Sequence, residues 1–400
     1  MSEIPLIQLP KAKTKGYETV SLYVGRSTYD EPKNKPGINH LLEHILMTND
    51  NVDRTSARMG LEQNAETHPG YVRFWFSTPR KHLNFCVKYL VKIASRPKFT
   101  HIKRESHAIR QELISLLEDT EYYSENAIIK RLFPNSGYYR GNDVKLMLSA
   151  LPRISNKKVL QKYFRENYRG NMFIVASSGK KLPNFKPLKH VPKRFVSRVP
   201  KMCPQSCKGP DVIHIQRPEV EKSQCNLIFY TSSFEGGNKA RHSTELASRI
   251  LSNGLDSLLY KILRDTLRLV YSVSCDVEIE PYGIVIDIKW SCDTKKVERC
   301  VSSIKDVLNK FNTHHFIGHK TLYIEHLRRG NSLTSKDIVD LYGDELVSWG
   351  KYQTVEKILG DVRKITRADV VKCVRKYMDF ERCFLVHVSS NKRAPISSLR

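Results

Sequence analysis

The sequence predicts an α+β protein made of two repeated domains, each of which ends in a helix followed by a strand. The chain has 400 residues, which exceeds an ordinary single domain, and 40% of them are hydrophobic, enough for two cores. In addition, a helical pattern followed by an apolar strand pattern occurs at residues 154–178 and again at residues 365–390. The chain therefore contains an internal repeat.

Matching landmarks support this repeat. In the first half, Ser155 precedes a helical pattern that leads to the apolar run at residues 172–175. In the second half, Thr366 precedes a similar pattern that leads to residues 383–386. Serine and threonine are favoured N-cap residues, so both are predicted to begin helices.

The segment between the halves is rich in lysine and proline and lacks periodicity. Such composition is typical of an extended linker, with a basic docking segment as the alternative. We therefore predict domains at residues 1–180 and 213–400, joined by a linker at residues 181–212.

Local periodicity predicts the elements of the first half. Alternating β-forming residues predict strands, whereas apolar residues at helical spacing predict helices. The predicted strands are Tyr17 to Gly25, Asn64 to Thr67 and Tyr71 to Ser77. The predicted helices are Gly37 to Met47, His82 to Ser95 and one with Thr100 as its N-cap that ends near Glu118.

The helix predicted at residues 37–47 separates two kinds of side chain. At about 100° per residue, one side collects the aliphatic residues Ile38, Leu41, Leu42, Ile45 and Leu46. His40, Glu43 and His44 fall on the opposite side. Two imidazoles four residues apart can share one zinc ion, and Glu43 can take a proton from water on that ion. His-x-x-Glu-His is the inverzincin signature; the alternative is a solvent-exposed helix face.

A third metal ligand has to come from another element. Glu105 and Glu112 lie seven residues apart and so share one face of their predicted helix. Glu112 would complete a His₂Glu set and leave one position open for water or substrate. From the residues alone, Glu118 and Glu121 are alternatives.

The remaining histidine cluster, His314, His315 and His319, is interpreted as structural or exposed. Adjacent imidazoles point about 100° apart on a helix. No acidic residue is expected near them, so we predict no second metal site.

Composition narrows the choice of partner and compartment. The net charge of +26 favours acidic partners, but lysine and arginine are spread along the chain, so nucleic acid is not favoured. The sequence contains no run of 18 apolar residues, so we predict no membrane span. Residues 1–16 lack the apolar core of a signal peptide. Nine scattered cysteines without a Cys-x-x-Cys pair predict reduced thiols and a cytoplasmic location.

Together these residues resemble the pitrilysin family of zinc peptidases, which includes insulysin and mitochondrial processing peptidase. The resemblance extends over nearly the whole chain and implies that each of the two repeated domains is a mostly antiparallel sheet packed with helices. In the first half it includes Gly25, Glu31, Gly37, His40-Leu-Leu-Glu-His44, Asn64-Ala65-x-Thr67, Glu105-x₆-Glu112 and Gly141. In the second half, Arg264 and Tyr271 keep the spacing of a family Arg/Tyr pair. Leu46-Met47-Thr48-Asn49 departs from the Phe-Lys-Gly of many relatives, which leaves the substrate open.

The resemblance implies a zinc endopeptidase with one Zn²⁺ per chain. In this interpretation the metal ligands are His40, His44 and Glu112, the proton acceptor is Glu43, the supporting acid is Glu105, and the substrate contacts are Arg264 and Tyr271. The substrate would be a peptide or unfolded polypeptide that pairs with a sheet edge at residues 64–67.

The resemblance also bears on assembly. The family's closed chamber has four such domains, so this chain would dimerise with a copy of itself or with a related chain. The alternative is a catalytically silent assembly subunit of the same fold. Some viral relatives carry a similarly bare motif, so a virion is a further expected location if the chain is viral.

Overall fold

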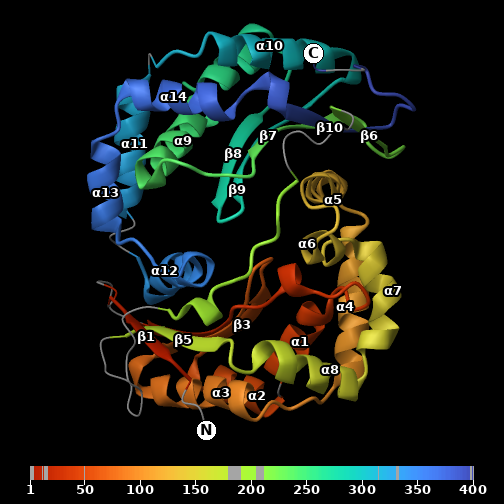
Figure 1. Ribbon diagram of the computed structural model, residues 1–400, viewed down its shortest axis with the longest axis vertical. Helices are drawn as coiled ribbons and strands as arrows, with labels where there is room; N and C mark the ends of the chain where they lie inside the picture. Colours follow the sequence, from red (N-terminus) through yellow and green to blue (C-terminus); the bar gives the residue numbers. More distant parts are fainter. Residues whose placement is uncertain are drawn as a thin grey trace. The chain divides into compact units, whose positions relative to one another are not determined.

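The computed structural model describes residues 4–10, 12, 17–48, 50–178, 191–203, 211–313, 315–329, 333–396 and 399 (Figure 1). They form two compact units, which we describe separately. The first unit comprises residues 1–118, 135–200 and 329–354, and the second comprises residues 119–134, 201–328 and 355–400.

Each unit contains one five-stranded sheet. The first sheet has the order β1 (Leu6–Leu9), β5 (Met172–Ser177), β2 (Tyr17–Val24), β4 (Val72–Pro79) and β3 (Glu62–Thr67). The second has the order β6 (Val212–Gln216), β10 (Cys383–Ser389), β7 (Ser223–Thr231), β9 (Gly283–Cys292) and β8 (Val273–Glu280). In both sheets only the first pair is parallel. The predicted α+β class and the duplication are therefore confirmed.

Helices pack on both sheets. The first unit contains α1 (Ile38–Met47), α2 (Asp50–Met59), α3 (Leu83–Ser95), α4 (Ile102–Leu116), α6 (Gly137–Arg140), α7 (Val144–Ile154), α8 (Lys157–Tyr163) and α12 (Ser335–Trp349). The second unit contains α5 (Thr120–Leu132), α9 (Gly237–Ser252), α10 (Val297–Asn309), α11 (Phe316–Arg329), α13 (Val355–Arg363) and α14 (Arg367–Tyr377).

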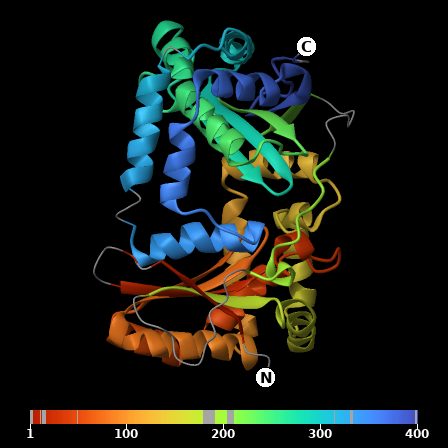
Figure 2. The same cartoon turned by 60° about the vertical axis from the view of Figure 1, so that its left-hand side comes forward.

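The two units do not follow the halves of the sequence. Helix α12 lies on the first sheet, on the face opposite α3, although more than 150 residues separate it from β5 (Figures 1 and 2). Helix α5 packs against β10 of the second sheet. The compact units thus differ from the predicted contiguous ranges 1–180 and 213–400, because each sheet takes one covering helix from the other half of the sequence.

Polar contacts fix α12 on its sheet. The Thr19 N–H donates to Ser335 Oγ at 2.9 Å, and the Tyr23 hydroxyl donates to the Val339 carbonyl at 3.1 Å. A Cβ atom on Gly343 would lie 2.4 Å from the Tyr23 oxygen, so glycine permits this close approach. The buried Arg73 forms ion pairs with Asp340 and Asp344 of α12 and with Glu66 of β3.

The structure shifts two predicted helix starts by one residue. The N-cap of α8 is Asn156, whose side chain accepts from Lys158 and Val159, whereas Ser155 ends α7. Helix α4 begins after His101, which adopts a left-handed conformation at φ 57°, so Thr100 is not its N-cap. Thr366 caps α14 as predicted, with Asp369 completing a capping box.

Part of the predicted linker belongs to a packed unit. Residues 191–200 are assigned to the first unit, and Phe195 is 1% exposed. The Phe195 ring centre lies 6.0 Å from that of Phe173 in β5, so this segment packs because an apolar side chain is buried against the first sheet. Arg26 Nη1 also donates to the Val196 carbonyl at 3.3 Å, which ties the segment to the end of β2.

Cysteine chemistry agrees only in part with the prediction of reduced thiols. Seven cysteines of the described residues are free, at positions 86, 225, 275, 292, 300, 373 and 383. Cys203 is disulfide-bonded, which departs from the prediction, and Cys207 lies outside the described residues. Among the helices of the described chain, none is both long and apolar enough to cross a membrane.

Candidate metal centre

Helix α1 is held at its N-terminus by a buried carboxylate. Glu31 Oε2 accepts from the Gly37 N–H at 2.7 Å, and Glu31 Oε1 accepts from the Asn39 N–H at 3.1 Å. These bonds satisfy free donors of the first turn and place a negative charge at the positive end of the helix dipole. Burial raises the pKa of Glu31 to about 7, although the bonds from Gly37 and Asn39 act in the opposite direction.

Close packing and a second amide fix the same turn. The Asn39 amide donates to Glu31 Oε1 at 2.9 Å, and its oxygen accepts from the Tyr168 hydroxyl at 3.1 Å. A Cβ atom on Gly141 would lie 2.6 Å from Glu31 Oε2, so only glycine allows this carboxylate its place. The start of α1 is therefore set by contacts with three other segments.

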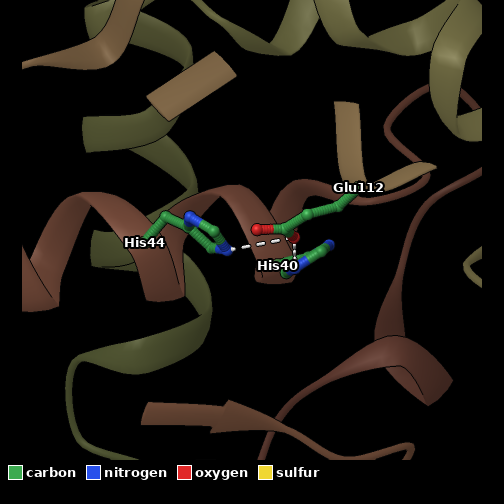
Figure 3. A group of neighbouring side chains, drawn as sticks. All are labelled: His40, His44 and Glu112. Carbon is green, nitrogen blue, oxygen red and sulfur yellow. Dashed lines mark ion pairs between the residues drawn. The ribbon is translucent and has the colours of Figure 1, made fainter. Parts of the chain in front are cut away.

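The aliphatic side of α1 is buried as the sequence pattern predicts. Its opposite side presents His40 and His44, whose ring centres lie 4.9 Å apart. Glu112 of α4 reaches both rings, with its Oε2 3.3 Å from His40 Nε2 and 3.5 Å from His44 Nε2. Figure 3 shows the two imidazoles and the carboxylate converging from these two helices.

These separations fit a tetrahedral metal ion. Two ligand atoms about 2.1 Å from zinc, at a tetrahedral angle, lie about 3.4 Å apart. The nitrogen–oxygen distances of 3.3 and 3.5 Å match that spacing. Within the described residues, this is the one group of at least three His, Cys, Asp or Glu side chains whose ligand atoms all lie within 4.8 Å of each other.

The charges at the site are coupled. Burial lowers the pKa of His40, but the hydrogen bond with Glu112 and the charges of Glu43, Glu112 and Glu31 raise it, and the net shift is upward. The hydrogen bond with His40 lowers the pKa of Glu112. Both shifts favour a protonated His40 beside an ionised Glu112, and metal binding would require His40 to lose that proton.

Glu105 lies behind one of the imidazoles. Its Oε2 is 3.4 Å from His44 Nδ1, and its Oε1 accepts from Arg104 Nε at 2.9 Å. His44 thus turns Nε2 toward Glu112 and Nδ1 toward Glu105. A carboxylate in this position orients a histidine ligand and increases its basicity.

Glu43 is positioned by the edge strand β3. Its Oε2 accepts from Thr67 Oγ1 at 2.9 Å. The neighbouring Glu66 points to the other face, where it accepts from Trp75 Nε1 at 3.0 Å and pairs with Arg73. These contacts anchor the end of β3, so Thr67 holds Glu43 from a fixed strand.

Arg264 and Tyr271 lie together in the second unit. The Arg264 guanidinium is 4.7 Å from the ring centres of Tyr260 and Tyr271, and Tyr271 is 75% exposed. Arg264 lies in a π-helix at Tyr260–Thr266, a geometry often found at functional sites. Their contact with substrate stays a prediction.

The second histidine cluster differs from expectation in one respect. Asp256 Oδ2 lies 2.7 Å from His315 Nδ1, although no acidic neighbour was predicted. The loop after α9 brings Asp256 there from a distant part of the sequence. His319 is buried, and His314 lies outside the described residues.

Sequence reasoning missed the direct partner of Glu43. Strand alternation places Ala65 and Thr67 on one face of β3, but no local signal shows that α1 packs on that face. The cap formed by Glu31 was also missed as a contact, because six residues of loop separate it from α1. The rival acids Glu118 and Glu121 are not part of the ligand group.

The fold and the site together define a duplicated α+β protein with a candidate His₂Glu metal site on two helices. A model of the insulinase family, peptidase family M16, matches residues 7–140, and a model of the peptidase M16 inactive domain matches residues 138–316. The chain belongs to this peptidase family.

Individual relatives are distant in sequence. The chain is 19% identical over 363 residues to an uncharacterized zinc protease of Bacillus subtilis, covering 86% of this chain and 87% of that protein. It is similar in structure to a protease from Helicobacter pylori, with a TM-score of 0.77, 16% identity and 96% of each chain covered. Pitrilysin gives a TM-score of 0.71 at 17% identity, with 97% of this chain but 44% of the pitrilysin chain covered. At these identities the structural likenesses show the fold.

Proposed function

We propose that the protein is a zinc-dependent endopeptidase that hydrolyses peptides or unfolded polypeptides. The observation that carries the proposal is the convergence of Glu112 Oε2 on both imidazoles, at 3.3 and 3.5 Å, with Glu43 on the same face of α1. This donor set, two nitrogens and one oxygen with an open position, is typical of catalytic zinc.

The chain's own residues have separate tasks in this proposal. His40, His44 and Glu112 would hold the ion, which supplies a Lewis acid and makes water acidic enough to ionise near pH 7. Glu43 takes the proton from the attacking water and later gives it to the leaving amine. Thr67 keeps the Glu43 carboxylate in place through the 2.9 Å hydrogen bond. Glu105 holds His44 in the orientation that presents Nε2.

The test separates metal binding from catalysis. Glu43→Gln preserves the size of the side chain and the metal ligands but removes the proton acceptor. We expect this variant to retain one zinc per chain by metal analysis and to lose cleavage of an unfolded polypeptide. His44→Ala should lose the zinc itself. Full peptidase activity in Glu43→Gln would remove Glu43 from the mechanism.

A silent assembly subunit is the second candidate. It is favoured by the match of residues 138–316 to a domain model described as inactive. This candidate predicts stoichiometric zinc without cleavage of any unfolded polypeptide, whereas the enzyme predicts both.

We further propose that the chain works as a dimer, with itself or with a related chain. The chain covers 44% of the pitrilysin chain, which supports a need for a second copy to complete an equivalent assembly. Light scattering of the purified protein tests this directly: a twofold mass supports a homodimer, whereas a monomer that cleaves peptides contradicts it.

A further inference from the structure

A strongly basic surface of the first unit, formed by α8 and the segments beside it, has no role in the mechanism above. Residues 96–103 and 153–169 contain nine lysines and arginines but only one acidic residue, Glu166, whereas the whole chain has 67 lysines and arginines for 41 acidic residues. All nine basic side chains are exposed. We call them the basic face: Arg96, Lys98, Lys103, Arg153, Lys157, Lys158, Lys162, Arg165 and Arg169.

The fold brings these two distant segments together. Ser106 Oγ of α4 donates to Ser155 Oγ at 2.7 Å, so the start of α4 meets the junction of α7 and α8 (Figure 1). The ring centres of Phe99 and Phe164 lie 5.9 Å apart, which places the segment before α4 against the π-helix Phe164–Tyr168 that follows α8. Lysine and arginine are spread along the sequence, but packing gathers these nine on one part of the first unit.

The charge of the basic face is not neutralised by the described residues. Eight of its nine cations have no carboxylate oxygen of a described residue within 4.0 Å. The ninth, Lys162, lies 3.9 Å from Glu166 Oε1, and both side chains are more than half exposed, so water screens this pair. An acidic partner could therefore contact these cations without first breaking a buried ion pair.

The spacing of the cations along α8 fits a partner of high charge density. Residues 157–165 cover eight steps of about 1.5 Å, or about 12 Å of helix. A DNA duplex carries one negative charge per about 1.7 Å of its axis, so about seven phosphate charges lie along this length. Four cations of the basic face lie within these nine residues: Lys157, Lys158, Lys162 and Arg165.

The surroundings of these cations narrow the class of acidic partner. In the described part of the chain, the exposed large hydrophobic side chains all lie outside residues 96–103 and 153–169. Protein interfaces depend on aromatic and aliphatic anchors, and membrane-surface helices combine a basic side with an apolar side. Single-stranded nucleic acid is bound by stacking of its bases on aromatic side chains. The basic face offers charge without any of these.

Neutral polar groups at the centre of the face are already engaged. Ser155 Oγ donates to the Leu151 carbonyl at 2.6 Å, and the Asn156 side chain caps α8. Duplex RNA is recognised largely through its 2′-hydroxyl groups, which call for such neutral partners. Cations alone suit the phosphates of duplex DNA.

We propose that the basic face binds the phosphate backbone of double-stranded DNA without reading its sequence. Lysine and arginine contact the phosphates, and the release of condensed counterions drives association. The inference goes beyond the proposed peptidase function and does not depend on it. Because the basic face and the metal centre belong to the same unit, DNA binding would bring the metal centre to proteins attached to DNA.

The test measures the affinity of the full chain for a fluorescent DNA duplex by anisotropy at several salt concentrations. Non-specific binding has a Kd of about 1–100 μM near physiological salt, and two duplexes of unrelated sequence should agree within about twofold. Each phosphate contact adds about 0.9 to the slope of log affinity against log salt. Combining Lys157→Gln, Lys158→Gln and Lys162→Gln should therefore reduce this slope by about 2.7 and raise the Kd at least about tenfold.

A matched control separates the basic face from overall charge. Lys295, Lys310 and Lys372 are exposed in the second unit, so Lys295→Gln, Lys310→Gln and Lys372→Gln together remove the same three charges elsewhere. The Kd of this control should stay within about twofold of the wild-type value. Arg165→Gln is a milder variant and should reduce the salt slope by about 0.9. Circular dichroism verifies that each variant is folded.

Each other outcome overturns the assignment. No binding of the duplex at low salt, an unchanged Kd in the α8 triple variant, or an equal loss in the control removes the basic face as a DNA site. Tighter binding of duplex RNA, single-stranded DNA, phosphatidylserine vesicles or polyglutamate than of duplex DNA assigns the face to that partner instead. Binding is measured without zinc or cleavage as a readout, so failure of the DNA proposal and failure of the peptidase proposal are distinguishable.

Discussion

Glu105 offers the sharpest test of how the proposed metal centre is built. Its Oε2 lies 3.4 Å from His44 Nδ1, and its side chain is 10% exposed. Glu105→Gln retains the shape and one acceptor oxygen but removes the charge. Glu105→Ala removes the acceptor as well, so the two substitutions separate the effect of charge from the effect of orientation.

The expected magnitude follows from this geometry. Partners behind a metal ligand are worth about 10–100-fold in metal affinity. The 3.4 Å separation is longer than an ideal hydrogen bond. Glu105→Gln should therefore lower zinc affinity by about tenfold, or about 1.4 kcal/mol, near the lower end of this range. The loss of zinc affinity in Glu105→Ala should approach the upper end of this range. Glu112→Gln should lose more zinc affinity than either variant, because it changes a proposed direct ligand.

Zinc affinity is measured by competition with a chromophoric chelator at fixed pH. Glu118→Gln is the matched control, because Glu118 is exposed just beyond α4 and lies outside the ligand group. An unchanged affinity in Glu105→Ala would refute the supporting role of Glu105. A loss as large as that of Glu112→Gln would instead make Glu105 a ligand.

Three further predictions concern other contacts. Thr67→Val removes the hydrogen bond to Glu43, so kcat should fall about tenfold or more while KM and zinc content stay unchanged. Thr67→Ser keeps a hydroxyl and should restore kcat. Equal kcat in the wild type and both variants contradicts the positioning role of Thr67. Arg73→Met leaves Glu66, Asp340 and Asp344 without their shared cation. Since these acids are about one-third exposed, denaturant unfolding should show a free energy of unfolding lower by about 3 kcal/mol, the lower end for a broken buried ion pair. A decrease under about 1 kcal/mol argues against a stabilising role for Arg73. Burial, followed by the charge of His214, lowers the pKa of His387 to about 4. The folding stability that the neutral ring contributes is therefore present above the unfolded pKa of about 6.5 and is lost, by about 3 kcal/mol, as pH falls through about 4. NMR titration of the ring measures this pKa, and an ordinary value excludes the prediction.

Local chemistry explains what the sequence could predict. The aliphatic stripe of α1 forces His40 and His44 onto the opposite face, because burying Leu41 and Leu42 fixes the rotation of the helix. The seven-residue spacing places Glu105 and Glu112 on one face of α4, where they reach opposite nitrogens of His44. Both inferences depend only on helical geometry.

Other features depend on contacts distant in sequence. Nothing near residue 335 indicates that α12 belongs with β2, since its partners Thr19 and Tyr23 lie more than 300 residues away. Likewise, His101 is a non-glycine residue in a left-handed conformation, which propensity disfavours, so the N-cap was placed one residue too early. Tertiary packing decided these positions.

The placement of α12 has a consequence for biosynthesis. The strands and helices that carry His40, His44 and Glu112 leave the ribosome early, but the helix that covers their sheet ends at Trp349 of 400 residues. Until then, the nascent chain exposes one face of that sheet, including the side chains of Tyr23 and Arg73 that α12 later contacts. A recombinant fragment limited to the first 180 residues would keep this face open, so the metal centre has to be studied in a chain that extends beyond α12.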